Sequence, residues 1–422
     1  MHSFRTIKMA FYWMLYLPIT GVSYFVAWLD RTLKFPLPFP RDIAQLAQQQ
    51  DWCIAELKEN GVLSTGAVVN QYKVTPLDQT FIFRSNAGII EIVYTNATGE
   101  HTLKCFAKFA PNVGTVWNRT IFNLQLNHIK EIFFNKYFVQ ADKGFPAPEV
   151  YVAKMSLLTG NLCLITEFMN DSIEHKDAIY KDFTAAHLQM VLAGLANLHA
   201  RYWKDTSARM KRVLPIENDT VYFFESMVLF SWSSAARQIL VNSWCRMNEH
   251  QTVLHGDTRI GNMMFPAAEG RGRFVFIDWQ AVRKGKAAYD LAYFLLLSLT
   301  EENRKLSEMQ SVKTYHACLV ANGVKDYSLE DLHEDYNHAC LAVLLLLSLP
   351  FLSGEASAEG DGAKIFAWGM GVWRERMQSK FAAFDYNWLA KNYNLTQQQG
   401  KDAIAEMLNV IDVRLKRIAA QN

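Results

Sequence analysis

The sequence predicts an α+β protein of two lobes, a β-rich lobe followed by a larger helical one. Residues 67–110 alternate apolar and polar side chains between short turns, which is typical of an antiparallel meander. From Asp182 onward, apolar residues recur at the spacing of amphipathic helices. The chain has 422 residues, 50% of them hydrophobic, which is enough for two or three compact domains and excludes a disordered or fibrous protein.

The N-terminal segment, residues 1–41, ends in a stiff linker with three prolines. Residues 9–28 carry no charge, and as a helix this 20-residue run is long enough to cross a bilayer. Pro18 and Gly21 interrupt it, and its tyrosines and tryptophans are residues that prefer a membrane interface. Two interpretations stay open: association with a membrane through residues 9–28, or a hairpin that packs on the core or covers an apolar pocket.

We expect the first lobe to span residues 42–169 and the helical lobe to span residues 170–422. In the first lobe, a short helix over 43–60 precedes strands at 80–84, 89–95, 102–109, 149–153 and 162–168, with a helix over 115–140 between the third and fourth strands. The helical lobe begins with a helix over 185–203, and residues 353–362, rich in small and acidic residues, form a surface loop.

Charge and cysteine content narrow the class of protein. There are 43 basic and 41 acidic residues, a net charge of +2, and no long basic run, so we expect no nucleic-acid partner. The six cysteines include no C-x-x-C pair, which argues against both a zinc site and a disulfide framework. A reducing, cytoplasmic location is the simpler interpretation, with membrane association as the open addition.

Two neighbouring segments of the helical lobe carry the chemistry. Residues 253–265 have apolar ends and a polar centre that contains Asp257 and Asn262, and residues 274–280 read as a buried strand that stops on Asp278. A turn between the segments would make them a hairpin and place Asn262 beside Asp278. Two acids and an amide suit Mg²⁺, which binds one or two carboxylates and completes its shell with nucleotide phosphates and water.

These residues resemble a known family. His255-Gly-Asp257, with Asn262 five positions after the aspartate and Ile-Asp278-Trp further on, resembles the catalytic loop of the aminoglycoside phosphotransferase and choline kinase superfamily. The Asp278-Trp-Gln ending and the stretch 289–294 are most similar to its ecdysteroid kinase-like branch of small-molecule kinases. The resemblance implies a two-lobed, protein-kinase-like fold.

The resemblance also implies roles for single residues. Asp257 would be the catalytic base, and Asn262 and Asp278 would hold magnesium. His255 would brace the loop, and Asp290 would cap it from the following helix.

A phosphotransferase of this kind needs a lysine that reaches the nucleotide phosphates and a glutamate that pairs with it. Lys104 and Lys108 share one face of the strand over 102–109, and Lys108 better matches the strand end of the family. We expect Glu131 on the next helix to be its partner and Lys104 to be solvated.

Nucleotide contacts are also expected in two further places. The loop with Ser85, Asn86 and Gly88 would cover the phosphates, although it lacks the full glycine set of protein kinases. Residues Glu167 and Met169 lie where the family pairs adenine with backbone groups.

Other conspicuous residues have structural interpretations. His199 is expected to be a hydrogen-bonded core residue, and Arg259 could either clamp phosphate or bridge to a carboxylate. Arg283, Lys284 and Lys286 are read as a solvated turn. The apolar run 341–352, with Trp368 and Trp373, is read as helical core packing, which is compatible with an acceptor pocket.

The sequence therefore predicts an enzyme that uses Mg²⁺ to move the γ-phosphate of ATP or GTP to a hydroxyl of a small molecule. The high aromatic and aliphatic content of the helical lobe favours an apolar acceptor over a polycationic one. The alternative is a membrane-associated, nucleotide-binding pseudokinase scaffold, against which the complete set of chemical residues argues. The sequence does not assign an oligomeric state.

Overall fold

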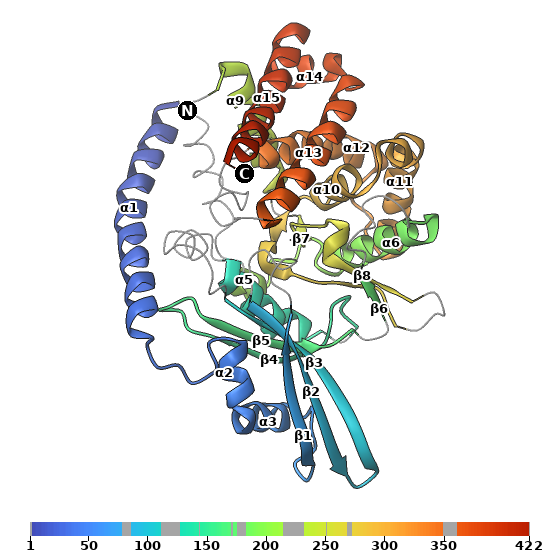
Figure 1. The fold of residues 1–422 in the computed structure, drawn as a ribbon. Helices are drawn as coiled ribbons and strands as arrows, with labels where there is room; N and C mark the ends of the chain where they lie inside the picture. Colours follow the sequence, from blue (N-terminus) through green and yellow to red (C-terminus); the bar gives the residue numbers. More distant parts are fainter. Residues whose placement is uncertain are drawn as a thin grey trace.

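The computed structural model describes most of the chain. The described residues are 2–77, 86–110, 127–142, 144–169, 172–174, 183–213, 232–249, 251–267, 272–348 and 361–421. Within them the chain forms a β-rich lobe and a larger helical lobe, so the predicted α+β class with two lobes is confirmed (Figure 1). The predicted strand over 80–84 and residues 353–360 of the loop predicted over 353–362 lie outside the described residues, and residues 361 and 362 begin a helix.

The first element, α1 (His2–Leu33), is one continuous helix with Pro18 inside it, so a hairpin is not formed here. The helix lies beside the two lobes, and the chain joins the β-rich lobe at the C-terminal end of the helix (Figure 1). Asp30 fixes that end, because its buried carboxylate pairs with Arg41 at 2.9 Å and accepts a hydrogen bond from Asn161 at 3.0 Å. Among the described helices, none is long and apolar enough to cross a membrane.

A five-stranded antiparallel sheet forms the first lobe, with the strand order β1-β2-β3-β5-β4. Its strands are β1 (Val68–Pro76), β2 (Asn86–Asn96), β3 (Gly99–Phe109), β4 (Val150–Met155) and β5 (Leu162–Glu167). The β2–β3 pairing runs without a break from Asn86 opposite Phe109 to Asn96 opposite Gly99, with a two-residue turn at Ala97-Thr98, and it forms a hairpin of the predicted meander. A strand earlier in the chain than the predicted one, β1, completes the meander.

Helices cover both faces of this sheet, since α2 and α3 share a core with Cys163 and Ile165 of β5, and α5 shares one with Leu162 and Leu164. The predicted helix over 43–60 is two helices, α2 (Ile43–Gln48) and α3 (Gln50–Glu59), which are separated at Gln49. Ile43, Leu46 and Leu57 are buried with Ile90 and Ile92 of β2 in one apolar core. The helix predicted over 115–140 is described from residue 127 onward, as α5 (Asn127–Phe134) and a turn of π-helix, η1 (Asn135–Val139).

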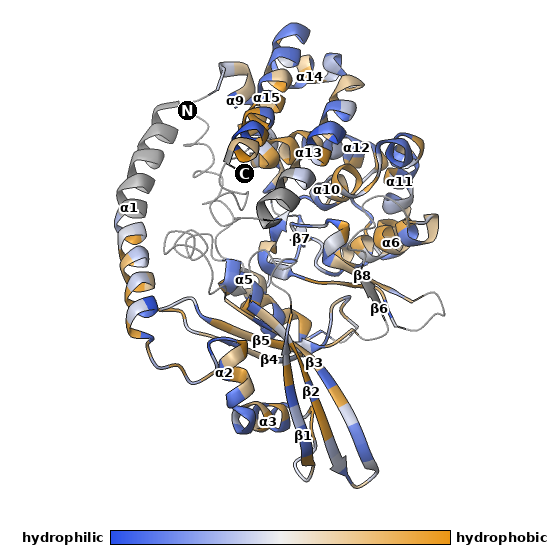
Figure 2. Cartoon of the chain, in the orientation of Figure 1, coloured by the Kyte–Doolittle hydropathy of each residue, from blue (hydrophilic) through white to orange (hydrophobic). Residues whose placement is uncertain are grey.

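The helical lobe is built mainly from long helices around one large apolar core. Its helices are α6 (Ala185–Arg201), α7 (Ala208–Val213), α9 (Ser234–Met247), α10 (Ala288–Ser298), α11 (Glu301–Ala321), α12 (Leu329–Ser348), α13 (Asp361–Ala382), α14 (Tyr386–Tyr393) and α15 (Gln397–Gln421). Figure 2 shows apolar residues along α10 and α12, both of which lie inside the bundle. Residues 341–345 and Leu347 are buried in α12, and Leu346 and Trp373 are partly buried against the same core, as expected. Trp368 is 53% exposed, so its predicted place in the helical core is wrong.

Two small sheets lie between the large sheet and the helices. One pairs β7 (Thr252–Leu254) with β10 (Arg283–Gly285), and the other has the order β6-β8-β9, formed by β6 (Ser172–Glu174), β8 (Met263–Pro266) and β9 (Val275–Phe276). Single turns of 3₁₀-helix, η2 (Ile260–Asn262) and η3 (Trp279–Ala281), follow β7 and β9. These short elements carry the polar residues that the sequence singles out.

Candidate active site

The predicted hairpin is present and brings the two polar segments together. Met263 of β8 pairs with Phe276 of β9, and the Ile277 N–H donates to the Asn262 carbonyl at 2.9 Å. Asn262, which ends η2 before β8, therefore lies opposite the point where β9 ends at Asp278. The middle of the predicted turn, residues 268–271, is outside the described residues.

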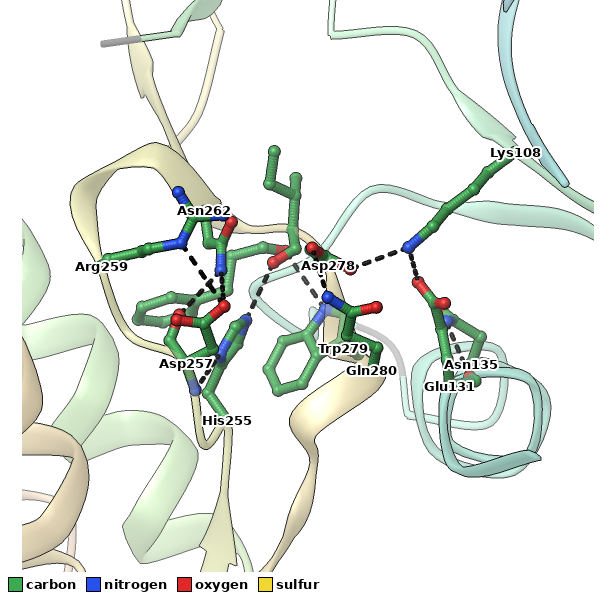
Figure 3. Close-up of polar contacts among 12 residues, drawn as sticks. Lys108, Glu131, Asn135, His255, Asp257, Arg259, Asn262, Asp278, Trp279 and Gln280 are labelled. Atoms are coloured by element: carbon green, nitrogen blue, oxygen red, sulfur yellow. Dashed lines mark hydrogen bonds and ion pairs between the residues drawn. The ribbon is translucent and has the colours of Figure 1, made fainter. Parts of the chain in front are cut away.

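Asp278 lies between the two lobes (Figure 3). Its Oδ1 is 2.8 Å from Nζ of Lys108, and the same Nζ is 2.7 Å from Oε1 of Glu131. Lys108 ends β3 and Glu131 lies on α5, so the predicted lysine–glutamate pair is formed. Lys104 instead makes a half-exposed ion pair with Glu91 at 3.2 Å, which confirms its predicted solvated position.

Lys108 and Glu131 are buried and Asp278 is partly buried, and the three groups shift one another's pKa values. Burial alone would lower the pKa of Lys108, but the Asp278 and Glu131 carboxylates together raise it above its ordinary value. For Asp278, burial opposes ionisation, yet Lys108 and Arg259 hold the pKa of the carboxyl below its usual range. For Glu131, burial outweighs the attraction of Lys108 and raises the pKa. Lys108 and Asp278 are therefore both charged at neutral pH.

Asp278 adopts a left-handed backbone conformation, with φ 64° and ψ 65°. This region is sparsely populated by residues other than glycine, asparagine and aspartate. Gln280 donates from Nε2 to Asp278 Oδ2 at 3.2 Å, and Trp279 is buried against Phe134 of α5 with ring centroids 4.6 Å apart. The turn after β9 is thus packed against the helix that carries Glu131.

Asp257 receives three donors. Asn262 Nδ2 lies 2.8 Å from its Oδ2 and 2.9 Å from its backbone carbonyl, and Arg259 Nε lies 3.4 Å from the same Oδ2 (Figure 3). The hydroxyl of Tyr293, on α10, donates to Oδ1 at 2.8 Å. Arg259 therefore bridges to a carboxylate, which is one of its two predicted interpretations, and that carboxylate is the one predicted to be the base.

Asp290 holds the loop before Asp257. Its fully buried carboxylate accepts the N–H of His255 at 2.7 Å and the N–H of Gly256 at 2.9 Å. Burial opposes its ionisation, but His199 and the loop amides keep the pKa of the Asp290 carboxyl below its ordinary value. The expected capping of the loop from the following helix is what the structure shows.

Both predicted histidines have structural contacts. His255 Nδ1 accepts the Asp257 N–H at 3.3 Å, so its Nε2 carries the proton and donates to the Ile277 carbonyl at 2.9 Å. The ring therefore ties the Asp257 loop to the strand before Asp278. His199 is a buried core residue, as predicted, with Tyr315 at 2.5 Å and Asp290 at 3.2 Å.

Gly256 lets the loop approach the turn after Asp278. Its φ is +84°, and a Cβ on this residue would lie 2.2 Å from the Ala281 carbonyl oxygen. Only glycine combines that backbone conformation with this close approach.

The predicted phosphate-covering residues have other contacts in the structure. Ser85 lies outside the described residues. Asn86 begins β2, and its side-chain oxygen accepts the N–H of Ile43 at 3.2 Å. Gly88 lies within β2, where a Cβ would be 2.8 Å from the Thr75 carbonyl oxygen. Packing against α2 and β1 thus accounts for both described residues, and their contact with phosphate stays a prediction.

The predicted hinge follows β5. Glu167 forms a two-pronged ion pair with Arg273, at 2.7 and 2.9 Å, and accepts the N–H of Glu149 at 3.1 Å. Its side chain therefore links the sheet to the segment before β9. Met169 lies just beyond the end of β5 and has no described contact that tests its role.

The prediction of a solvated turn after the Asp278 strand is wrong. Arg283, Lys284 and Lys286 are not a solvated turn, because Arg283 and Lys284 belong to β10, which pairs with β7. The Arg283 guanidinium lies 4.1 Å from the ring centre of Tyr289, and Lys284 is buried. Lys286 is 3.4 Å from the buried carboxylate of Asp335. Pairing with a buried strand overrides the local preference of three cations for water.

Sequence reasoning missed two contacts of the site, those of Tyr293 and Gln280. Both residues stand inside motifs that it quoted, at positions 289–294 and 278–280, but without a role. Tyr293 lies one helical turn after Asp290 on α10, so the same helix face that caps the loop also reaches Asp257. That spacing was the available signal.

The oxygen-rich donor set suits magnesium. Within the described residues, no group of three or more His, Cys, Asp or Glu side chains could hold a metal alone. Mg²⁺ does not need such a cage, because it binds through one or two protein oxygens together with substrate phosphates. Asn262 donates to Asp257 through Nδ2, which leaves its Oδ1 to face a cation near Asp278.

Comparisons with known proteins agree with the resemblance that the motifs indicate. Residues 231–325 match the model of the ecdysteroid kinase-like family. This stretch contains the loop of Asp257, the β8–β9 hairpin, Asp278 and α10 with Asp290. No curated protein sequence matches the chain.

Several solved structures are similar in part. An ethanolamine kinase of Plasmodium vivax has a TM-score of 0.46 and 12% identity, covering 82% of this chain and 90% of its own. The choline kinase LicA of Streptococcus pneumoniae has a TM-score of 0.42 and 13% identity, covering 80% of this chain and 100% of its own. An aminoglycoside phosphotransferase solved with AMP-PNP and hygromycin B has a TM-score of 0.39 and 14% identity. The match covers 77% of this chain and 98% of the phosphotransferase chain.

Proposed function

We propose that this protein is a Mg²⁺-dependent phosphotransferase that moves the γ-phosphate of ATP or GTP to a hydroxyl of a small molecule. The observation that carries the proposal is the position of Lys108 Nζ, within 2.8 Å of carboxylates from both lobes. A lysine held in this way between a helix glutamate and a carboxylate next to the Asp257 loop is what positioning of a nucleoside triphosphate requires.

Each residue has a place in the reaction. Lys108, set by Glu131, would bind phosphate oxygens. Asn262 and Asp278 would hold magnesium, which supplies positive charge to the phosphates when it is bound. Asp257 would accept the proton of the attacking hydroxyl, and His255 would keep its loop joined to the Asp278 strand.

The nucleotide would lie between the sheet and the Asp257 loop, with Glu167 and Met169 near adenine and Ser85, Asn86 and Gly88 near the phosphates. On this proposal the chain divides into residues 1–41, a nucleotide-binding lobe over 42–169 and a helical lobe over 170–422 that holds the acceptor. An apolar acceptor remains our preferred class, because of the high aromatic and aliphatic content of the helical lobe.

We also propose a cytoplasmic location with contact between α1 and a membrane surface. Ile19, Val22 and Phe25 are more than half exposed on this helix, although apolar side chains of this size are normally covered. The intact ion pairs of Lys108 argue against the alternative scaffold function, because a protein without catalytic activity has no chemical reason to retain them.

Nucleotide binding and turnover test the proposal. Melting temperature is measured with ATP and with GTP, with and without Mg²⁺, and ADP release is followed in wild type, Asp257→Asn and Asp278→Ala. At a free ligand concentration of 100 times Kd, binding stabilises the fold by about 2.7 kcal/mol. We expect Asp278→Ala to lose the Mg²⁺-dependent rise and Asp257→Asn to keep it but lose ADP release.

Lys104→Met is the matched control, since it removes a lysine from the same face of β3 without touching the site. Metal-dependent binding with no turnover in wild type, even with a panel of alcohols, would favour the scaffold. Failure to bind either nucleotide would reject both functions.

A further inference from the structure

The hydroxyl of Tyr293 is the one donor to Oδ1 of Asp257 among the described residues. We propose that Tyr293 is a positioning residue that orients Asp257 so that Oδ1 is the oxygen that takes the proton of the acceptor. This inference rests on the proposed function and adds a residue to its machinery.

The two carboxylate oxygens of Asp257 differ in how many hydrogen bonds they already accept. An ionised carboxylate oxygen can accept about two hydrogen bonds. Oδ2 already receives Asn262 Nδ2 at 2.8 Å and lies 3.4 Å from Arg259 Nε, whereas Oδ1 receives only the Tyr293 hydroxyl at 2.8 Å. Within the described part of the chain, Oδ1 is therefore the oxygen with room for one more donor, such as the hydroxyl of an acceptor.

Tyr293 is well placed to fix this orientation. It is 6% exposed, and it lies on α10, whose Asp290 grips the backbone of His255 and Gly256. The helix thus holds both the backbone of the loop and the side chain at its centre. Burial, together with the Asp257 carboxylate, raises the pKa of Tyr293 well above its ordinary value, so the phenol remains a donor.

The step can be written with all atoms assigned. The acceptor oxygen forms a bond to the γ-phosphorus, and the bond from that phosphorus to the bridging oxygen breaks, so that the nucleoside diphosphate leaves. The acceptor proton moves to Asp257 Oδ1 and passes to solvent after product release. Without the Tyr293 hydroxyl, the Asp257 carboxylate can rotate about its side-chain bond. Its Oδ1 then faces the acceptor hydroxyl in only a fraction of the bound complexes.

Tyr293→Phe is the test, and Tyr289→Phe is the matched control. Tyr289 lies one turn earlier on the same helix, its ring is 5.9 Å from that of Tyr293, and its buried hydroxyl has no hydrogen-bond partner among the described residues. The assay is ADP release from Mg²⁺-ATP with water as the acceptor. We expect kcat to fall about 10- to 100-fold in Tyr293→Phe, the effect of one hydrogen bond to a charged group, with the Kd and KM for ATP unchanged.

Two results would overturn the inference. One is a Tyr293→Phe enzyme with wild-type kcat. The other is a loss of ATP binding that matches the loss of kcat, or an equal loss in Tyr289→Phe, since either would indicate general damage to the fold rather than positioning of Asp257.

The proposed function can fail separately. If the wild-type protein releases no ADP, the hydrogen bond between Tyr293 and Asp257 is tested instead. The free energy of unfolding in urea is measured for wild type, Tyr293→Phe, Asp257→Ala and the double variant. A positioning contact predicts that the two changes are not additive. Additive losses of stability would reject the contact itself, whatever reaction the protein performs.

Discussion

Asp290→Asn is the sharpest perturbation of the loop that carries Asp257. The Asp290 carboxylate is fully buried and accepts two backbone N–H groups, from His255 and Gly256, at 2.7 and 2.9 Å. Asparagine has nearly the same shape but replaces one acceptor oxygen with an NH₂ group. One of the two backbone donors would then face another donor, and its hydrogen bond would be lost without any change in volume.

The size of the effect follows from these contacts. A hydrogen bond to a charged group contributes about 1.5–3 kcal/mol, and breaking a buried charged arrangement costs about 3–5 kcal/mol. We therefore expect the free energy of unfolding to fall by about 3–5 kcal/mol, a large part of the roughly 5–15 kcal/mol typical of a domain. Activity should fall as well, because the displaced backbone is that of the residues directly before Asp257.

Urea unfolding at pH 7, followed by tryptophan fluorescence, measures the change. Asp326→Asn is the control, since Asp326 is an exposed carboxylate that pairs with Lys204 and Trp203, and its loss should matter little. An Asp290→Asn protein as stable as Asp326→Asn would refute the reasoning.

The pH dependence gives a second check on Asp290. Because its folded pKa is below the ordinary value of about 3.9, its charge contributes stability above that pH. The contribution is lost as the pH falls through the lower, folded pKa. The stability difference between wild type and Asp290→Asn should therefore be constant near neutral pH and shrink below about pH 4.

Three further predictions concern other parts of the molecule. Lys108→Met should abolish the nucleotide-induced rise in melting temperature, and an unchanged rise would place the nucleotide elsewhere. Gly256→Ala should destabilise the fold by about 2–4 kcal/mol in urea unfolding, through left-handed strain and a clash with Ala281; Gly61→Ala, which has φ +72° and open space, should show the strain alone. Deleting residues 1–34 should abolish co-sedimentation with lipid vesicles, and equal sedimentation of both proteins, or none of the full chain, would contradict a membrane contact.

Sequence reasoning was most informative for residues that lie close together along the chain, because short-range connections fix their relative positions. A hairpin between two nearby segments fixes its register through a short turn, so Asn262 and Asp278 could be placed side by side before the structure was known. Alternation along a strand likewise put Lys104 and Lys108 on one face. The choice of Lys108 over Lys104 came from the resemblance to the strand end of the family, and the structure shows its ion pairs with Glu131 and Asp278.

Contacts that depend on packing between distant elements were beyond sequence reasoning. The hydrogen bond from Tyr293 to Asp257 spans 36 residues and depends on how α10 is rotated against the loop. The pairing of β10 with β7, which buries Lys284, reverses what three nearby cations suggest by themselves. Asn86 and Gly88 were read as a loop, but the pairing of β2 with β3 begins at Asn86.

Lys108 makes one ion pair within its own lobe and one ion pair across to the other lobe. Its bond to Glu131 lies within the sheet lobe, whereas its bond to Asp278 crosses to the other lobe. A rotation that opens the lobes would break the second bond and spare the first, so the lysine would stay charged and correctly aimed while the site is open. Nucleotide entry would then exchange one carboxylate partner for phosphate oxygens, which makes the distance from Lys108 to Asp278 a direct measure of lobe closure.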